Sequence, residues 1–191
     1  MIEINFDKLY RYPRIAEPCT ICIPVEKGKI YSKDNVCVMQ DGKPVPTQAK
    51  VTSRYDDTSI RYLFVRFMAD LPANKGTKVY CELDCKDVND NPDILCTESS
   101  TGIEVDTGAL KFKVEDYASY IFKEVNDGNK IYTNENFAGP YLKEADGTSY
   151  DIELEEWNII ECGQVCVSLC TKGVNAVSYT HLRAHETGAY L

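Results

Sequence analysis

The chain has 191 residues, enough for one complete domain or for one domain and part of a second. Hydrophobic residues make up 43% and charged residues 27%, which supports a buried core and excludes a disordered tail or a collagen-like chain. The formal net charge of −9 disfavours nucleic acid as a partner. Short apolar runs and an acidic start with Glu3 and Asp7 lead us to expect a cytoplasmic protein with no membrane partner.

Segments rich in β-branched and aromatic residues recur along the chain, and almost none of it has helical periodicity. These segments predict strands at residues 20–25, 36–40, 45–52, 59–68, 77–83, 103–106, 110–114, 120–125, 131–133, 150–154 and 158–171. An Asp-Gly pair lies between two such segments at three places, residues 41–42, 127–128 and 146–147. Asp and Gly both tolerate the positive φ of a tight turn, so each pair predicts a β-hairpin. The pattern therefore predicts an all-β fold.

A polar stretch at residues 87–101 is rich in Asp, Asn, Ser and Thr and predicts a linker. It separates a first β domain at residues 1–86 from a second at residues 102–176.

Residues 177–187, with the sequence VSYTHLRAHET, resemble the one-frame translation of a transposase mosaic-end sequencing adapter. We therefore interpret residues 177–191 as adapter-derived and expect the natural chain to continue past Ala176. Both histidines, His181 and His185, fall within this string. Residues 1–176 consequently predict no imidazole metal site and no histidine-activated nucleophile.

Nine cysteines are many for this length, and they occupy positions 19, 22, 37, 81, 85, 96, 162, 166 and 170. Their odd number and the lack of a signal peptide argue against a closed disulfide framework. Cys19 and Cys22 have a zinc-like spacing, but they lie in a strand-like string that does not wrap an ion. Cys162, Cys166 and Cys170 are expected to share one face of either a strand or a helix. We expect all nine to be reduced, small apolar residues, with a metal site as the alternative.

Neighbouring carboxylates occur at residues 56–57 and 155–156. Paired acids can perform glycoside hydrolysis, but sequence neighbours on a strand point to opposite faces. Turn and edge positions are therefore the favoured interpretation of both pairs.

Arg54, Tyr55 and Arg61 are the candidate substrate-binding residues. A guanidinium can bind the carboxylate of a sugar acid through two hydrogen bonds, and a tyrosine ring can stack on a pyranose. Strict alternation places Arg61 and Tyr62 on opposite faces, so a core strand with charged ends is the favoured interpretation and sugar binding is the alternative. The sequence has no glycine-rich phosphate loop and no nucleophile elbow, and we assign no catalytic residue, no metal and no cofactor.

Five short motifs follow one another along the chain. They lie at residues 17–28, 39–48, 57–63, 105–112 and 157–165 and include IPVEKG, DGKPVPTQ, DTSIRYL and VDTGALKF. In this order they resemble the amino-terminal region of the exo-rhamnogalacturonan lyase and YetA-like family, over nearly all of residues 12–173. Thr58 stands where that family usually has Gly, and Tyr55 and Tyr62 stand where Trp is common.

The resemblance implies a small RIFT-type barrel over residues 1–86, followed by a truncated antiparallel β-sandwich over residues 102–176. It also implies that a helical toroid holding the lyase site would follow. We therefore expect the non-catalytic front domains of a pectin-degrading polysaccharide lyase, inactive on their own. The implied partners are an oligosaccharide or polysaccharide bound through the missing catalytic domain and the downstream domains themselves. The alternative is a stand-alone β-rich carbohydrate-binding or structural module.

Overall fold

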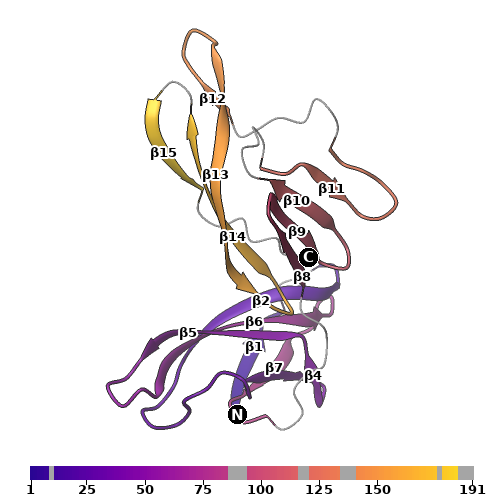
Figure 1. The fold of residues 1–191 in the computed structure, drawn as a ribbon. Helices are drawn as coiled ribbons and strands as arrows, with labels where there is room; N and C mark the ends of the chain where they lie inside the picture. The colour runs from indigo at the N-terminus through magenta and orange to yellow at the C-terminus, as the bar shows by residue number, and fades with distance from the viewer. Residues whose placement is uncertain (9–10, 86–93, 116–120, 134–140, 176–177, 185–191) are drawn as a thin grey trace. The chain divides into compact units, whose positions relative to one another are not determined.

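The computed structural model describes residues 1–8, 11–85, 94–115, 121–133, 141–175 and 178–184 (Figure 1). Every regular element in these residues is a β-strand, and the strands pair in antiparallel sheets. The prediction of an all-β fold is therefore confirmed. The described residues contain no apolar helix of the length that a bilayer crossing requires. The chain divides into two compact units, residues 1–92 with 190–191 and residues 93–189.

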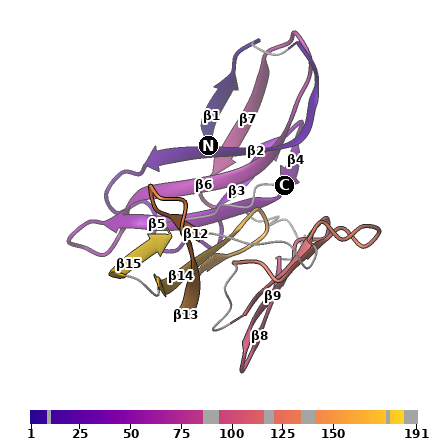
Figure 2. The ribbon, with the colours of Figure 1, turned by 90° about the horizontal axis from the view of Figure 1, so that it is seen from above.

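The described part of the first unit forms two antiparallel sheets. Its strands are β1 (Ile2–Phe6), β2 (Arg14–Pro24), β3 (Cys37–Gln40), β4 (Lys43–Val45), β5 (Thr47–Arg54), β6 (Ile60–Leu71) and β7 (Thr77–Glu82). One sheet has the order β1-β7-β3-β4 and the other the order β2-β6-β5. Figure 2 shows β1 beside β7 and shows β2, β6 and β5 side by side. Neither sheet closes on itself among the described residues, so the closed barrel implied by the family resemblance is not formed.

The two sheets meet at a corner between β4 and β5. Pro46 lies at this corner and has no N–H to extend a ladder, while its carbonyl accepts a hydrogen bond from the Met68 N–H at 3.0 Å. The Thr47 hydroxyl accepts a 3.1 Å hydrogen bond from the Val38 N–H and donates a 2.8 Å bond to the Val45 carbonyl. The chain therefore passes from one sheet to the other without losing these backbone hydrogen bonds.

The first unit has one apolar core, to which β6 contributes every second side chain. Leu63, Val65, Phe67 and Ala69 are at most 1% exposed. This is the period of two that places alternate residues of a strand on one face. Buried residues from the other strands complete the core, including Ile23, Val38, Val79 and Cys81.

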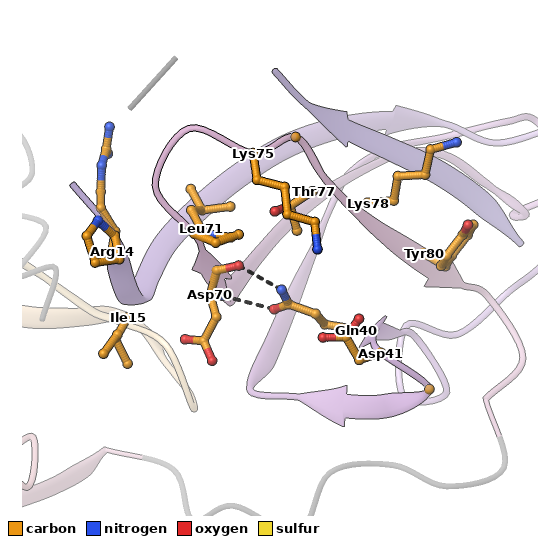
Figure 3. A pocket seen from close by; sticks show the side chains of 14 residues that line it. Arg14, Ile15, Gln40, Asp41, Asp70, Leu71, Lys75, Thr77, Lys78 and Tyr80 are labelled. Atoms are coloured by element: carbon orange, nitrogen blue, oxygen red, sulfur yellow. Dashed lines mark hydrogen bonds between the residues drawn. The ribbon is translucent and has the colours of Figure 1, made fainter. Parts of the chain in front are cut away.

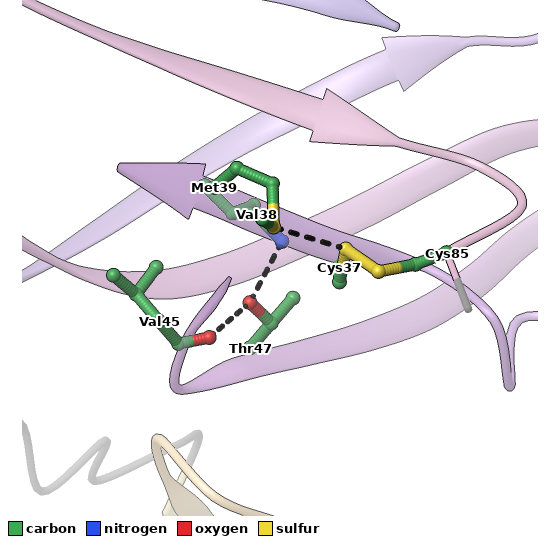
Figure 4. Close-up of a disulfide and its surroundings, with 6 residues drawn as sticks. All are labelled: Cys37, Val38, Met39, Val45, Thr47 and Cys85. Atoms are coloured by element: carbon green, nitrogen blue, oxygen red, sulfur yellow. Dashed lines mark hydrogen bonds between the residues drawn. A yellow bond between two sulfur atoms is a disulfide. The ribbon is translucent and has the colours of Figure 1, made fainter. Parts of the chain in front are cut away.

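Cys37 and Cys85 form a disulfide with a Cα–Cα distance of 5.9 Å (Figure 4). The Cys85 N–H donates a 2.8 Å hydrogen bond to the Asn35 carbonyl, which brings the chain after β7 back beside the start of β3. The prediction that every cysteine is reduced is therefore wrong for this pair. A cysteine count could not reveal the pair because the two residues are 48 positions apart.

The second unit contains two further antiparallel sheets in its described residues. Its strands are β8 (Leu95–Ser99), β9 (Gly102–Asp106), β10 (Lys111–Glu115), β11 (Glu124–Asn126), β12 (Tyr141–Lys143), β13 (Ser149–Cys162), β14 (Val167–Asn175) and β15 (Ser178–Ala184). The strand orders are β11-β10-β9-β8 and β12-β13-β14-β15. Ile103, Val105 and Val114 of the first sheet share a core with Leu154 and Val167 of the second, as in a β-sandwich. Strand β15 lies within the adapter-like string.

All three Asp-Gly pairs lie at hairpin turns, as predicted. Asp41 and Gly42 have φ values of 51° and 76°, the double positive φ of a two-residue turn between β3 and β4. At residues 127–128 and 146–147 only the glycine has positive φ, and the turn at 146–147 is longer. The Asp-Gly pattern therefore predicted where the chain reverses, but the backbone conformation of the Asp differs among the three sites.

Two predicted boundaries in the second unit are wrong. Residues 95–99 of the predicted linker form β8, which pairs with β9 across a short turn, whereas residues 86–93 lie outside the described residues. The predicted strand at residues 158–171 is two strands, because the chain turns between Cys162 and Val167. Cys162 is exposed and Cys166 is buried, so the three cysteines of this region do not share one face.

Candidate functional site

Arg54, the first candidate binding residue, lies at the end of β5 and hydrogen-bonds to the backbone. Its Nη1 donates to the Tyr31 carbonyl at 2.9 Å and to the Thr58 carbonyl at 2.7 Å. Thr58 has a φ of 67°, a conformation that costs a β-branched residue energy and that glycine adopts freely. Arg54 therefore supports the turn between β5 and β6, and its side chain is already engaged by protein atoms.

Tyr55 and Arg61, the other two candidates, come together with Tyr62 on the surface of the first unit. The Arg61 guanidinium carbon lies 5.7 Å from the centre of the Tyr55 ring and 5.4 Å from the centre of the Tyr62 ring. Both distances allow an attraction between the cation and the ring faces. The Tyr55 hydroxyl donates a 3.1 Å hydrogen bond to the Val25 carbonyl, which holds this ring in place. We call Tyr55, Arg61 and Tyr62 the Tyr–Arg cluster.

A β-bulge creates the Tyr–Arg cluster. Ser53 pairs with Tyr62 and Arg54 pairs with Ile60, so Arg61 is the extra residue without a partner on β5. Such a bulge breaks the alternation of a strand and redirects its side chains. Arg61 and Tyr62 are both exposed, whereas Ile60 is fully buried. The expectation that Arg61 and Tyr62 lie on opposite faces is therefore wrong.

The acidic residues near the Tyr–Arg cluster have other partners. Asp56 pairs with the Lys27 Nζ at 2.5 Å. Asp57 Oδ1 accepts hydrogen bonds from the Ser59 hydroxyl at 2.5 Å and the Ser59 N–H at 3.0 Å. The bond from the Ser59 side chain lowers the pKa of Asp57 and keeps it ionised near neutral pH. Within the described part of the chain, Arg61 contacts rings but no carboxylate.

The first unit also contains a pocket of about 610 Å³, which the sequence did not predict (Figure 3). It lies between the start of β2, the β3–β4 hairpin and the β6–β7 connection, and its lining residues are Pro13, Arg14, Ile15, Gln40, Asp41, Gly42, Asp70, Leu71, Pro72, Lys75, Gly76, Thr77, Lys78 and Tyr80. Several of these residues carry charge.

The pocket wall is held by one side-chain amide. Gln40 Nε2 donates to the Asp70 carbonyl at 2.8 Å, and the Asp70 N–H donates to Gln40 Oε1 at 2.9 Å. The Asp70 carboxylate in turn accepts a 2.8 Å bond from the N–H of Ala16, which has a φ of 50° at the irregular start of β2. Gln40 and Asp70 are 30 positions apart, so no local pattern could indicate this contact.

Two of the cations around the pocket are paired with acids that lie outside its lining. Lys78 forms a 2.9 Å ion pair with Glu3, and the hydrogen bond from Lys78 lowers the pKa of Glu3. Arg14 pairs with Glu17. Arg14 and Lys78 are thus engaged outside the pocket, and the Gln40–Asp70 contact joins its walls, so we assign it a structural role at the junction of the hairpins.

We expect Gln40→Ala to lower the free energy of unfolding by about 1 kcal/mol, because two hydrogen bonds are lost but water can replace them at this half-buried position. Gln40→Glu keeps the acceptor and loses the donor, so an intermediate loss is expected. Urea denaturation followed by circular dichroism measures both. An unchanged midpoint for Gln40→Ala would show that the contact does not stabilise the junction.

Cys37, Glu82 and Cys85 offer three potential metal ligands within 4.8 Å of one another. The two sulfurs are joined in the disulfide, however, and only a thiolate sulfur binds a cation well. This group is therefore not a metal site in the oxidised protein.

Comparisons with known proteins concern the fold. No protein-family model matches the chain, and no curated protein sequence does. An α-mannosidase from Enterococcus faecalis V583 is similar in structure, with a TM-score of 0.50 and 12% identity over 90% of this chain. A glycosyl hydrolase family 38 protein from Enterococcus faecalis has a TM-score of 0.47 and 14% identity over 86% of this chain. The matched region covers 23% of each of those chains. At 12% identity, the similarity to the α-mannosidase shows a shared fold and no more.

Proposed function

We propose that the chain forms non-catalytic β units of a carbohydrate-active protein of the exo-rhamnogalacturonan lyase type. Its first unit binds uronate-bearing, pectin-derived oligosaccharides at the Tyr–Arg cluster. The proposal joins the motif resemblance to one structural observation, which is the exposed Arg61 guanidinium between two tyrosine rings.

Arg61 has the chemistry that a sugar acid requires. A guanidinium presents paired N–H donors that match both oxygens of a carboxylate. In the described residues these donors face no protein carboxylate, since Asp56 and Asp57 bind Lys27 and Ser59 instead. A bound uronate would therefore meet a positive charge that no intramolecular ion pair neutralises.

The two tyrosines complete the proposed subsite. Their rings already lie near the guanidinium, and an exposed ring provides an apolar face for the C–H groups of a pyranose. Tyr55 is anchored through its hydroxyl, so little ordering is needed when a sugar binds. The fold shared with an α-mannosidase also supports a place for this chain in a carbohydrate-active protein.

Calorimetric titration of the whole chain tests the proposal with two probes. One is a rhamnogalacturonan tetrasaccharide, and the other is the same sugar with its carboxylates reduced to alcohols. We expect the acidic sugar to bind at least about tenfold more tightly than the reduced one, and Arg61→Ala to lose a similar factor, equivalent to about 1.4 kcal/mol. Arg61→Lys should recover only part of the affinity, because an ammonium cannot form the paired contact.

Arg11→Ala is the matched control, since it removes the same charge from another exposed position of the first unit. It should leave the affinity unchanged. Equal affinities for the two sugars, or for wild type and Arg61→Ala, would contradict the proposal. Sequencing of the intact gene separates the two forms of the proposal: a following helical toroid supports the lyase, and an early stop supports a stand-alone module.

A further inference from the structure

We propose that Cys96 and Cys162 are a redox modification site that forms a reversible disulfide between the two sheets of the second unit. The Sγ atoms of these two residues lie 3.1 Å apart. Cys96 belongs to β8, which is the edge strand of its sheet, and Cys162 is the last residue of β13 in the other sheet. A disulfide requires a separation of about 2.05 Å, so an approach of about 1 Å makes the bond.

The backbone around the pair already holds the two strands together. The Ile94 N–H donates a 3.0 Å hydrogen bond to the Gly163 carbonyl, and Cys162 Sγ donates to the Ile94 carbonyl at 3.1 Å. Each cysteine thus lies within two residues of an inter-sheet backbone contact. Closure of the disulfide needs side-chain adjustment rather than a rearrangement of the sheets.

The two thiols differ in a way that suits two successive steps. Cys162 is exposed and can meet an oxidant directly, whereas Cys96 is partly buried. Burial and the neighbouring Cys162 raise the pKa of Cys96 to about 12, so its thiol stays protonated and reacts slowly with molecules in solution. Cys162 is therefore the residue that reacts first with the oxidant, and Cys96 is the residue that resolves the intermediate.

A small-molecule disulfide such as oxidised glutathione is the co-reactant. The Cys162 thiolate attacks one glutathione sulfur, the glutathione disulfide bond breaks, and one glutathione thiolate leaves. Cys96 then releases its proton to solvent and attacks Cys162 Sγ, which expels the second glutathione thiolate. The two expelled thiolates take up the two protons lost by the cysteines. Two protein thiols are oxidised to one disulfide, and one glutathione disulfide is reduced to two thiols.

The test uses the whole chain, first reduced and then incubated with oxidised glutathione. The exchange is quenched with acid, the remaining thiols are alkylated with a maleimide in denaturant near neutral pH, and peptides are mapped by mass spectrometry without reduction. We expect a peptide pair linked through Cys96 and Cys162, lighter by the mass of two hydrogen atoms, and the loss of both positions from the alkylated peptides. Later addition of dithiothreitol should restore both.

Two variants each remove one of the two reacting thiols, and a third removes a different cysteine as the control. Cys96→Ser should keep glutathione on Cys162, because the resolving thiol is absent. Cys162→Ser should leave Cys96 unmodified, and Cys170→Ser should form the linked peptides as wild type does. The wild-type map decides the proposal even if a variant does not fold. Glutathione retained on Cys162 beside an alkylated Cys96, two alkylated thiols, or a link from Cys162 to another chain would overturn it.

Discussion

Replacing Cys37 and Cys85 together with alanine is expected to lower the free energy of unfolding of the first unit by about 2–4 kcal/mol. The disulfide closes a loop of 48 positions, and its loss gives the unfolded chain more conformations. The two residues are 1% and 5% exposed, so the change also removes buried contacts. Urea denaturation followed by far-ultraviolet circular dichroism measures the loss as a lower midpoint.

Two controls accompany this measurement. Cys22→Ala removes an exposed free thiol and should change the stability by less than about 0.5 kcal/mol. The single tryptophan, Trp157, lies in the second unit, so its fluorescence transition should keep the wild-type midpoint. A wild-type midpoint that does not fall when the protein is reduced would show that the disulfide does not stabilise the first unit.

Gly102→Ala is expected to destabilise the second unit by about 3 kcal/mol or more, the range of severe backbone and packing changes. A Cβ at Gly102 would lie 2.1 Å from the Val114 carbonyl oxygen and 2.9 Å from the Glu115 Cα. Both atoms belong to the backbone of β10, with which Gly102 pairs, so no side-chain rotation relieves the clash. Val114 is fully buried, and a shift of β10 would therefore disturb the core.

Gly108→Ala is the matched control in the same unit. Gly108 has a φ of 84°, but a Cβ there would meet no atom within 4 Å, so only the conformational cost of about 1–2 kcal/mol is expected. Trp157 packs against the core of the second unit, and its fluorescence reports both transitions. Equal midpoints for the two variants would refute the argument that close strand approach requires Gly102.

The hydrogen bonds that Asp57 accepts beside the proposed sugar subsite are expected to persist as the pH falls. The folded-state pKa of Asp57 is lowered by the Ser59 hydrogen bonds, so this carboxylate stays ionised as the pH falls below its ordinary value of 3.8. Asp57 therefore keeps its bonds to Ser59 at pH values where an aspartate with the ordinary pKa would be partly protonated.

The all-β character was predictable because it depends on local preferences. β-branched and aromatic residues recur in short segments, and Asp-Gly pairs adopt the turns that reverse the chain. Three short strands, β1, β8 and β12, were missed. The apolar–polar alternation of β1 is itself a strand signal that was overlooked, whereas β8 and β12 have only two apolar residues each. The place of the latter two in their sheets depends on pairing with β9 and β13, which only the folded chain provides.

The candidate site was predictable only as a set of residue types. Arg54, Tyr55 and Arg61 have side chains that suit a sugar acid, and this much follows from composition. The tertiary structure separated them, because Arg54 binds the Tyr31 and Thr58 carbonyls while a bulge turns Arg61 toward Tyr55. A bulge depends on how two strands register with each other, and a one-residue shift changes which face a side chain occupies.

For the cysteines too, the sequence and the tertiary structure each decided a different part. The sequence by itself determined how many there are and the all-β context in which they lie. The tertiary structure decided that Cys37 meets Cys85 and that Cys96 meets Cys162, over separations of 48 and 66 positions. Contacts between residues so far apart depend on the order of strands in the sheets, which is set by burial of the whole core rather than by any local pattern.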